Sequence, residues 1–113
     1  CDKLENYLDI SGEKPALQHG DLWSGNYFPD EDQVPCIFDP AVYFGLREAD
    51  LAMTELFGRL PQNFYDAYHE AFPLNPGYEE RKDLYNLYHL LNHLNLFGGS
   101  YLASVEQVLK KYH

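Results

Sequence analysis

Eight residues near the start of the chain, His19-Gly20-Asp21-Leu22-Trp23-Ser24-Gly25-Asn26, decide how the rest of the sequence is interpreted. Asp21 lies two residues after a His and five residues before an Asn, which gives the spacing H-x-D-x-x-x-x-N. Gly20 and Gly25 would let the backbone turn tightly on both sides of Asp21. Asp and Asn in a Gly-rich segment are also common turn residues that bond their own backbone, so the spacing alone leaves that alternative open.

The spacing is the one used in phosphoryl transfer. There the Asp accepts the proton of the acceptor hydroxyl, and the Asn holds Mg²⁺ on the nucleotide phosphates. A second acid, Asp39, ends the apolar run Cys36-Ile37-Phe38, where a kinase-like site carries its other metal ligand. Mg²⁺ prefers oxygen ligands and takes one or two of them from protein. We therefore expect Asp21 to be the catalytic base, and Asn26 and Asp39 to bind the metal and the nucleotide.

Length and charge limit the choice of partners. The chain has 113 residues, enough for one domain or part of one, and 45% of them are hydrophobic. Its net charge of −10 repels phosphate backbones, so we expect no nucleic-acid partner. The sequence holds no Gly-rich phosphate loop and no apolar strand with a phosphate-binding lysine. Either Mg²⁺ supplies the positive charge, or the phosphate cradle lies on a part of the protein outside these residues.

The cellular location is inferred from what the sequence lacks. No apolar run approaches the roughly 18–20 residues of a membrane span, so we expect no membrane partner. The first residue is Cys1 rather than Met, which indicates a processed piece or a fragment. Two cysteines, Cys1 and Cys36, are too few for a disulfide scaffold, and a cytoplasmic location follows. Cys36, within an apolar run, is expected to be a small core residue.

Hydrophobic periodicity predicts an α+β unit that is mostly helical. We expect the tail of a helix over 2–8, an extended piece over 16–18, and a hairpin with strands over 27–28 and 36–38. Irregular structure is expected over 39–45, followed by helices over 47–57, 62–71, 78–97 and 100–111. The chain is thus divided into a catalytic loop (19–26), a metal-binding hairpin (27–39) and a helical part (47–113). The hairpin would bring Asn26 close to Asp39.

Several side chains have two explanations. Asp50 lies in the first turn of a helix. It either interacts favourably with the positive end of the helix dipole, or accepts hydrogen bonds from the catalytic loop and braces it. The acids over 30–32 are interpreted as a solvated turn, because the spacing of a calcium loop is missing. His89 and His93 lie four apart, as zinc ligands can, but no third ligand is evident, so they are interpreted as histidines at the core edge. Tyr85, Tyr88 and Tyr101 are assigned to packing.

Four stretches together carry a family resemblance: QHGDLWSGN (18–26), IFDPAVYFG (37–45), READLAMTELFG (47–58) and the long segment FYDAYHEAFPLNPGYEERKDLYNLYHLLNHLNLFGG (64–99). They resemble the fructosamine kinase (ketosamine 3-kinase) family, most closely its bacterial members. Trp23-Ser24-Gly25 distinguishes this family from the related aminoglycoside and choline phosphotransferases. The resemblance implies a protein-kinase-like fold and ATP-dependent phosphorylation of the 3-hydroxyl of ketoamines, which makes the sugar adduct unstable and so repairs glycated amines. Bacterial relatives are expected to prefer ribulosamines or erythrulosamines.

Residue roles follow from the same resemblance. Asp21 would be the catalytic base, Asn26 and Asp39 would hold Mg²⁺ and ATP, and Trp23 would contact the substrate. His19 and Asp50 would brace the catalytic loop. Family members are two to three times longer, and their N-terminal lobe carries the phosphate-covering loop and the ATP-binding lysine. The chain therefore looks like the C-terminal lobe alone, and we expect it to have little kinase activity by itself.

Two other functions remain open. The chain could belong to a phosphotransferase for another alcohol, of the aminoglycoside or choline type. It could also be a non-catalytic binding or assembly module that associates through an exposed inter-lobe face, because removing one lobe uncovers apolar surface.

Overall fold

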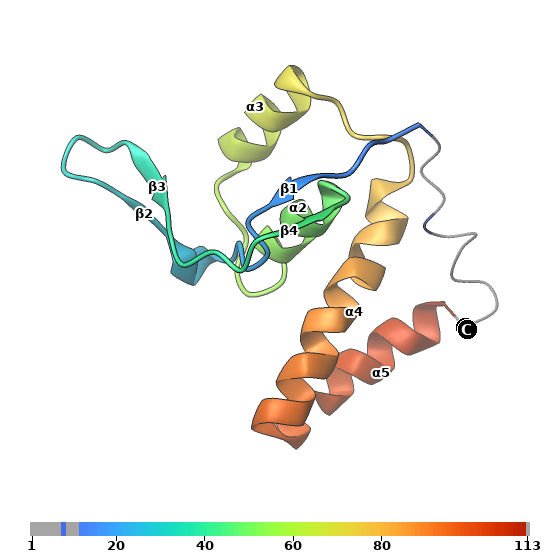
Figure 1. Ribbon diagram of the computed structural model, residues 1–113. Coiled ribbons are helices and arrows are strands. Elements are labelled where there is room, and N and C mark those ends of the chain that lie inside the picture. The colour runs from blue at the N-terminus through green and yellow to red at the C-terminus, as the bar shows by residue number, and fades with distance from the viewer. Residues whose placement is uncertain (1–7, 9–11, 113) are drawn as a thin grey trace.

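The computed structural model describes Leu8 and residues 12–112, in which two small antiparallel sheets lie beside a group of helices (Figure 1). One sheet pairs β1 (Ala16–Gln18) with β4 (Tyr43–Gly45), and the other pairs β2 (Tyr27–Pro29) with β3 (Pro35–Ile37). The helices are α2 (Glu48–Thr54), α3 (Gln62–Ala71), α4 (Tyr78–Phe97) and α5 (Leu102–Lys111), with 3-10 turns η1 (Ser24–Asn26) and η2 (Gly99–Tyr101). About half of the residues are helical, in an α+β architecture. The helix expected over 2–8 lies outside the described residues except for Leu8.

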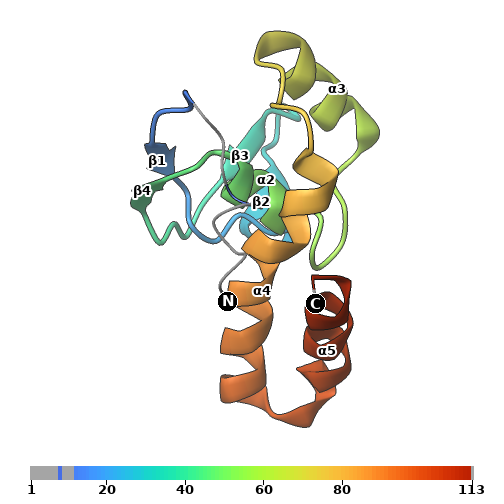
Figure 2. The same cartoon turned by 90° about the vertical axis from the view of Figure 1, so that its right-hand side faces the viewer.

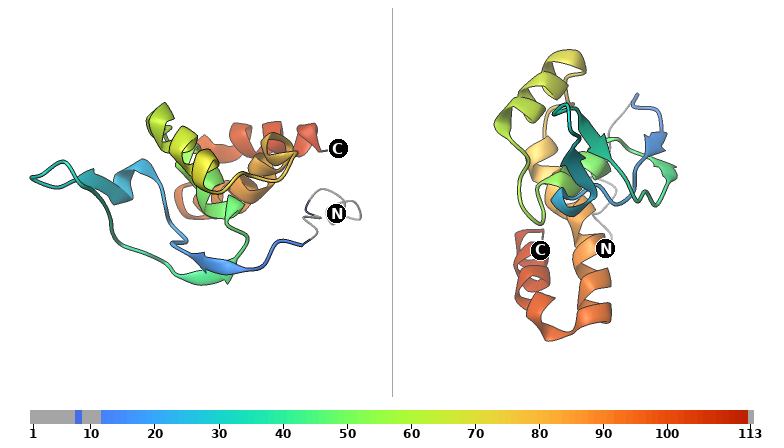
Figure 3. Two further views of the ribbon diagram at one scale, coloured as in Figure 1. Left: turned by 90° about the horizontal axis from the view of Figure 1, so that it is seen from above. Right: turned by 90° about the vertical axis from the view of Figure 1, so that its left-hand side faces the viewer.

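The β2–β3 hairpin extends away from the rest of the molecule (Figure 3). Its turn is closed by Asp30, whose Oδ1 accepts hydrogen bonds from the backbone N–H groups of Asp32 (2.9 Å) and Val34 (2.8 Å). The acids at the tip therefore form a turn, as expected. Cys36 is only half-buried on this hairpin, so its assignment to a core is wrong. No other described element covers the strand that carries it.

A strand occupies the end of the segment expected to be irregular. β4 pairs with β1 in the register Leu17↔Phe44, and the Gln18 side-chain amide donates to the carbonyls of Ala16 (3.1 Å) and Gly45 (3.2 Å). A three-residue strand has too little periodicity to be detected in a sequence. It forms because β1, 27 residues away, provides a partner for its backbone. The β1–β4 pair lies on one side of the helices.

Helix α2 lies at the centre of the helical part and packs against α4. Leu51, Ala52 and Met53 are all buried, as the apolar pattern predicts. The helix is shorter than the expected 47–57. The N–H groups of Glu55 and Leu56 bond to carbonyls three residues back, at 3.1 Å each, which tightens the last turn and ends the helix.

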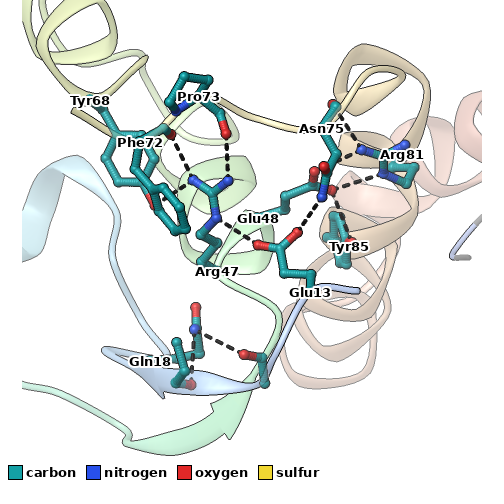
Figure 4. Close-up of polar contacts among 12 residues, drawn as sticks. Glu13, Gln18, Arg47, Glu48, Tyr68, Phe72, Pro73, Asn75, Arg81 and Tyr85 are labelled. Atoms are coloured by element: carbon teal, nitrogen blue, oxygen red, sulfur yellow. Dashed lines mark hydrogen bonds and ion pairs between the residues drawn. The ribbon is translucent and has the colours of Figure 1, made fainter. Parts of the chain in front are cut away.

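Two networks of charged side chains, neither of them expected from the sequence, hold α2 in place (Figure 4). Glu48 is fully buried, and its carboxylate accepts hydrogen bonds from Arg81 Nε (2.9 Å), Arg81 Nη2 (2.7 Å) and the Tyr85 hydroxyl (3.1 Å). This forked contact ties the first turn of α2 to the first turns of α4.

The second network ties α2 to the segment before β1. Arg47 Nε donates to Glu13 Oε1 at 2.6 Å, and its other nitrogens donate to the carbonyls of Phe72 (2.9 Å) and Pro73 (2.7 Å). Glu13 Oε2 accepts a further hydrogen bond from Asn75 Nδ2 at 2.8 Å. The strand that leads into the loop over 19–26 is therefore anchored to the helical part at its entry.

Helices α4 and α5 form a helical hairpin, and η2 is the connection between them (Figure 2). The expected helix over 100–111 thus begins with a 3-10 turn. On α4, Tyr88 is 70% exposed and Leu91 is exposed, whereas Asn86 and Leu90 are buried. The packing role assigned to Tyr88 is therefore wrong. No helix in the described part of the chain combines the length and apolarity needed to span a membrane.

Candidate functional site

Hydrogen bonds to α2 hold the start of the loop over 19–26 in place. Asp50, in the first turn of that helix, accepts hydrogen bonds from the backbone N–H groups of His19 (2.7 Å to Oδ2) and Gly20 (3.0 Å to Oδ1). A carboxylate that bonds two successive N–H groups fixes the start of the loop, which is the contact a brace makes. Gly20 has φ of 85°, and a Cβ there would lie 2.0 Å from the Ala41 carbonyl oxygen, so only glycine fits.

Asp21 and Asn26 lie in direct contact. Asn26 is buried, and its Nδ2 donates to the backbone oxygen of Asp21 (2.9 Å) and to its carboxylate Oδ2 (3.1 Å). This pair keeps one carboxylate oxygen of Asp21 engaged and leaves the other without a bond to the described residues. The Asp21 side chain is thus oriented while retaining one oxygen that can accept a proton.

Gly25 has a different role from the turn expected of it. A Cβ on this residue would lie 2.2 Å from the Trp23 ring, so glycine is needed because the indole covers it. Trp23 is 37% exposed and meets the Phe57 ring edge-on, with centroids 6.2 Å apart. The loop therefore presents a fixed aromatic ring two residues after Asp21.

His19 links the loop to the segment that carries Asp39. Its Nδ1 accepts the N–H of Asp21 (3.2 Å), and its Nε2 lies 2.8 Å from the Phe38 carbonyl, to which it donates in the Nε2–H tautomer. The Phe38 N–H donates to the Asn26 carbonyl (3.1 Å). Asp39 thus follows directly after a residue bonded to both ends of the loop. Its φ of 56° is rare outside glycine, and Asp is among the residues that tolerate it.

The residues at this site fit a magnesium ion. Asn26 uses its Nδ2 on Asp21, and its Oδ1 makes no hydrogen bond with the described residues, so an amide oxygen is left to coordinate. Asp39 is exposed and follows Phe38, whose backbone is hydrogen-bonded to His19 and Asn26. His, Cys, Asp and Glu side chains form no cluster of three or more that could hold a metal within the described ranges. Two protein oxygens, completed by phosphate and water, suit Mg²⁺ rather than a metal with an all-protein cage.

A cleft of about 730 Å³ opens beside Asp21. The loop forms one wall with Gly20, Asp21 and Trp23. The other wall comes from the second half of α4 and from η2, and its polar or aromatic members are Tyr88, His89, Asn92, His93, Phe97 and Tyr101. Sequence reasoning missed this wall. The spacing of His89 and His93 indicates that they share a helix face, but nothing in the sequence says that this face meets Asp21.

The two histidines of the cleft differ in their surroundings. His93 Nδ1 lies 2.7 Å from the His89 carbonyl, and its ring stacks at a tilt on Phe57 and Tyr101, with centroids 4.8 and 5.3 Å away. This agrees with the expected position at the core edge. The His89 ring nitrogens make no hydrogen bond with the described residues. Burial lowers the pKa of His89, which outweighs the nearby negative charges of Asp21 and Asp50, so its imidazole is neutral at pH 7.

Known proteins resemble this chain over nearly its whole length. The sequence pattern of the fructosamine kinase family matches residues 1–113. The chain is 54% identical over 109 residues to a "Probable ketoamine kinase" of Synechocystis sp., covering 96% of this chain and 37% of that protein. It is 48% identical over 99 residues to the "Protein-ribulosamine 3-kinase, chloroplastic" of Arabidopsis thaliana, covering 88% of this chain and 30% of the relative.

The structure also matches a crystal structure of a protein assigned as a fructosamine-3-kinase from Thermobifida fusca, with a TM-score of 0.88 and 40% identity. That match covers 97% of this chain and 38% of the other. The chain therefore spans well under half the length of the relatives it matches. The family match over every residue, the sequence identities and the shared fold lead to one conclusion: this chain belongs to the fructosamine kinase family.

Proposed function

We propose that this chain is the C-terminal lobe of an ATP-dependent kinase that phosphorylates the 3-hydroxyl of ketoamines, such as ribulosamine or fructosamine adducts, and so takes part in repair of glycated amines. The observation that carries the proposal is the contact of Asp21 with Asn26, in a loop that Asp50 holds and that His19 ties to Phe38, the residue before Asp39. Family membership supports the substrate class, since relatives are named as ketoamine and ribulosamine kinases. A cytoplasmic location is part of the proposal, although the Arabidopsis relative is named chloroplastic.

In this proposal each side chain has one task. The free carboxylate oxygen of Asp21 accepts the proton of the acceptor hydroxyl as the hydroxyl oxygen attacks the γ-phosphorus of ATP, whose bond to the bridging oxygen breaks and releases ADP. Asn26 holds Asp21 through Nδ2 and, with Asp39, would bind Mg²⁺ and through it ATP. When bound, Mg²⁺ neutralises charge that develops on the phosphates. Trp23 would contact the substrate from the same loop.

The proposal also predicts that the 113-residue chain alone has little or no activity. It carries neither a Gly-rich phosphate loop nor a lysine strand, and it is strongly acidic. Phosphoryl transfer depends almost wholly on positioning and on neutralising charge. A full-length protein that contains this chain should transfer phosphate from ATP to a ribulosamine, and the chain by itself should not.

The decisive test replaces Asp21 by Asn in the full-length protein. The rate of ketoamine phosphorylation should fall about 10²–10⁴-fold, because the base is removed while the size and the Asn26 contact are kept. Asp66→Asn, an exposed acid on α3, is the matched control and should leave the rate unchanged. Full activity in Asp21→Asn would rule out the catalytic assignment.

Two alternatives give different results in the same experiment. A phosphotransferase for another alcohol would also lose activity with Asp21→Asn, but would prefer an aminoglycoside or choline in a substrate screen at fixed ATP. A binding or assembly module would not respond to Asp21→Asn at all. One observation favours the module: Leu17, Val42 and Phe44 of the β1–β4 region are 63–74% exposed, an apolar face suited to association. Sedimentation at several protein concentrations would detect such self-association.

A further inference from the structure

The cleft beside Asp21 is lined by aromatic rings and carries one negative charge. Of the charged side chains, only Asp21 lines it, and neither Lys nor Arg does. Aromatic rings make up much of the remaining lining, contributed by Trp23, Phe57, Tyr88, Phe97 and Tyr101. A concave, aromatic cleft with a few polar groups is typical of small-molecule sites. Without a positive side chain, it disfavours an acceptor that already carries phosphate or carboxylate.

His89 is one of the polar side chains of this cleft, with Asn92, that make no hydrogen bond with the described residues. It is half-buried, its ring packs edge-on against Tyr88 with centroids 5.4 Å apart, and its nitrogens make no hydrogen bond with the described residues. His93, by contrast, already uses Nδ1 on the His89 carbonyl. A half-buried imidazole whose nitrogens have no hydrogen-bond partner among the described residues can form one with a ligand that enters the cleft.

We infer that His89 is a positioning residue for the acceptor: its imidazole hydrogen-bonds a hydroxyl of the acceptor and holds the neighbouring, reacting hydroxyl at Asp21. This inference rests on the proposed function and adds a residue that recognises the acceptor through a hydrogen bond. The acceptor chain would lie between Trp23 and the face of α4, with its C–H groups on the aromatic rings. Neutral and amine-bearing acceptors fit this cleft, and phosphorylated acceptors do not.

A neutral imidazole suits this task because it both donates and accepts. The groups around it are the carboxylates of Asp21 and Asp50, which favour the protonated ring, and His93, which opposes it. Burial has the largest effect, so the pKa of His89 is lowered and the ring stays neutral at pH 7. A protonated His89 would instead pair with Asp21 and compete with its role as base.

The test compares His89→Phe with His89→Gln in the full-length protein, by steady-state kinetics with ATP and a ribulosamine. His89→Phe keeps the ring and removes both nitrogens, and should raise the acceptor KM about tenfold while the KM for ATP stays within about twofold. His89→Gln keeps a donor and an acceptor and should restore most of the affinity. His69→Phe on α3, an exposed histidine outside the cleft, should match the wild type.

Each outcome separates the inference from the proposed function. If the wild type transfers no phosphate to any ketoamine, the proposed function itself fails. If the wild type is active and His89→Phe melts normally but has an unchanged acceptor KM, the positioning role is refuted. If His89→Phe does not fold, NMR of the His89 imidazole in the wild-type protein tests the inference instead. Added acceptor should shift the His89 ring nitrogen signals, and unmoved signals would refute the inference.

Discussion

Breaking the buried contact between Glu48 and Arg81 should destabilise the protein more than breaking any surface ion pair. Arg81→Met keeps most of the side-chain volume. It leaves the Glu48 side chain, which is 0% exposed, with the Tyr85 hydroxyl as its only remaining hydrogen-bond partner among the described residues. It also frees the carbonyls of Asn75 and Pro76, to which Arg81 donates at 3.2 and 2.8 Å. Removing one partner of a buried pair costs about 3–5 kcal/mol, a large share of the roughly 5–15 kcal/mol that stabilises a folded domain.

The assay is urea unfolding of a full-length protein that contains the chain, followed by circular dichroism. Lys111→Met is the comparison, because the Lys111–Asp83 pair is equally short at 2.6 Å but its side chains are 46% and 34% exposed. That change should cost about 0.2–1 kcal/mol. The double variant Glu48→Gln/Arg81→Met should recover part of the loss, since no buried charge is then unpaired. If Arg81→Met costs no more than Lys111→Met, the central role of the buried contact is refuted.

Three further predictions concern the loop and the cleft. Gly20→Ala should abolish activity and lower stability, because the new Cβ would meet the Ala41 oxygen at 2.0 Å, whereas Gly99→Ala, with open space around it, should change neither. Asp39→Ala should raise the Mg²⁺ concentration needed for half-maximal activity at least about tenfold while the acceptor KM is kept, and an unchanged requirement would contradict the metal role. In His89→Gln, the free energy of unfolding should decrease less steeply below about pH 6.5 than it does in the wild type. A lowered pKa in the folded state means that the unfolded chain takes up this proton first, so wild-type stability is lost as pH falls through that range.

The parts that sequence reasoning predicted are those whose signal is local. Helices α3 and α4 have the expected bounds because their apolar spacing extends over 10 and 20 residues. The hairpin was predictable because a polar turn separates two apolar runs. Pairing of β4 with β1 was not, since three-residue strands are stabilised by partners far away in the sequence. The exposed positions of Cys36 and Tyr88 were missed because an apolar pattern identifies a face but not what covers it.

The candidate site likewise has one part that sequence patterns indicate, the loop over 19–26, and one part that they do not, the α4 wall of the cleft. Helix α2 connects the two parts. Asp21, Asn26 and Asp39 were singled out from their short spacings, and their roles stay predictions. His89 was missed because it lines the cleft from a helix 68 residues further along the chain. Helix α2 contributes Asp50 to the catalytic loop and, two residues earlier, Glu48 to Arg81 of α4. The distance between Asp21 and the α4 wall of the cleft is therefore set through one buried turn of helix. A change that loosens the Glu48–Arg81 contact should impair acceptor binding before it impairs the Asp21–Asn26 contact, because only α4 is released.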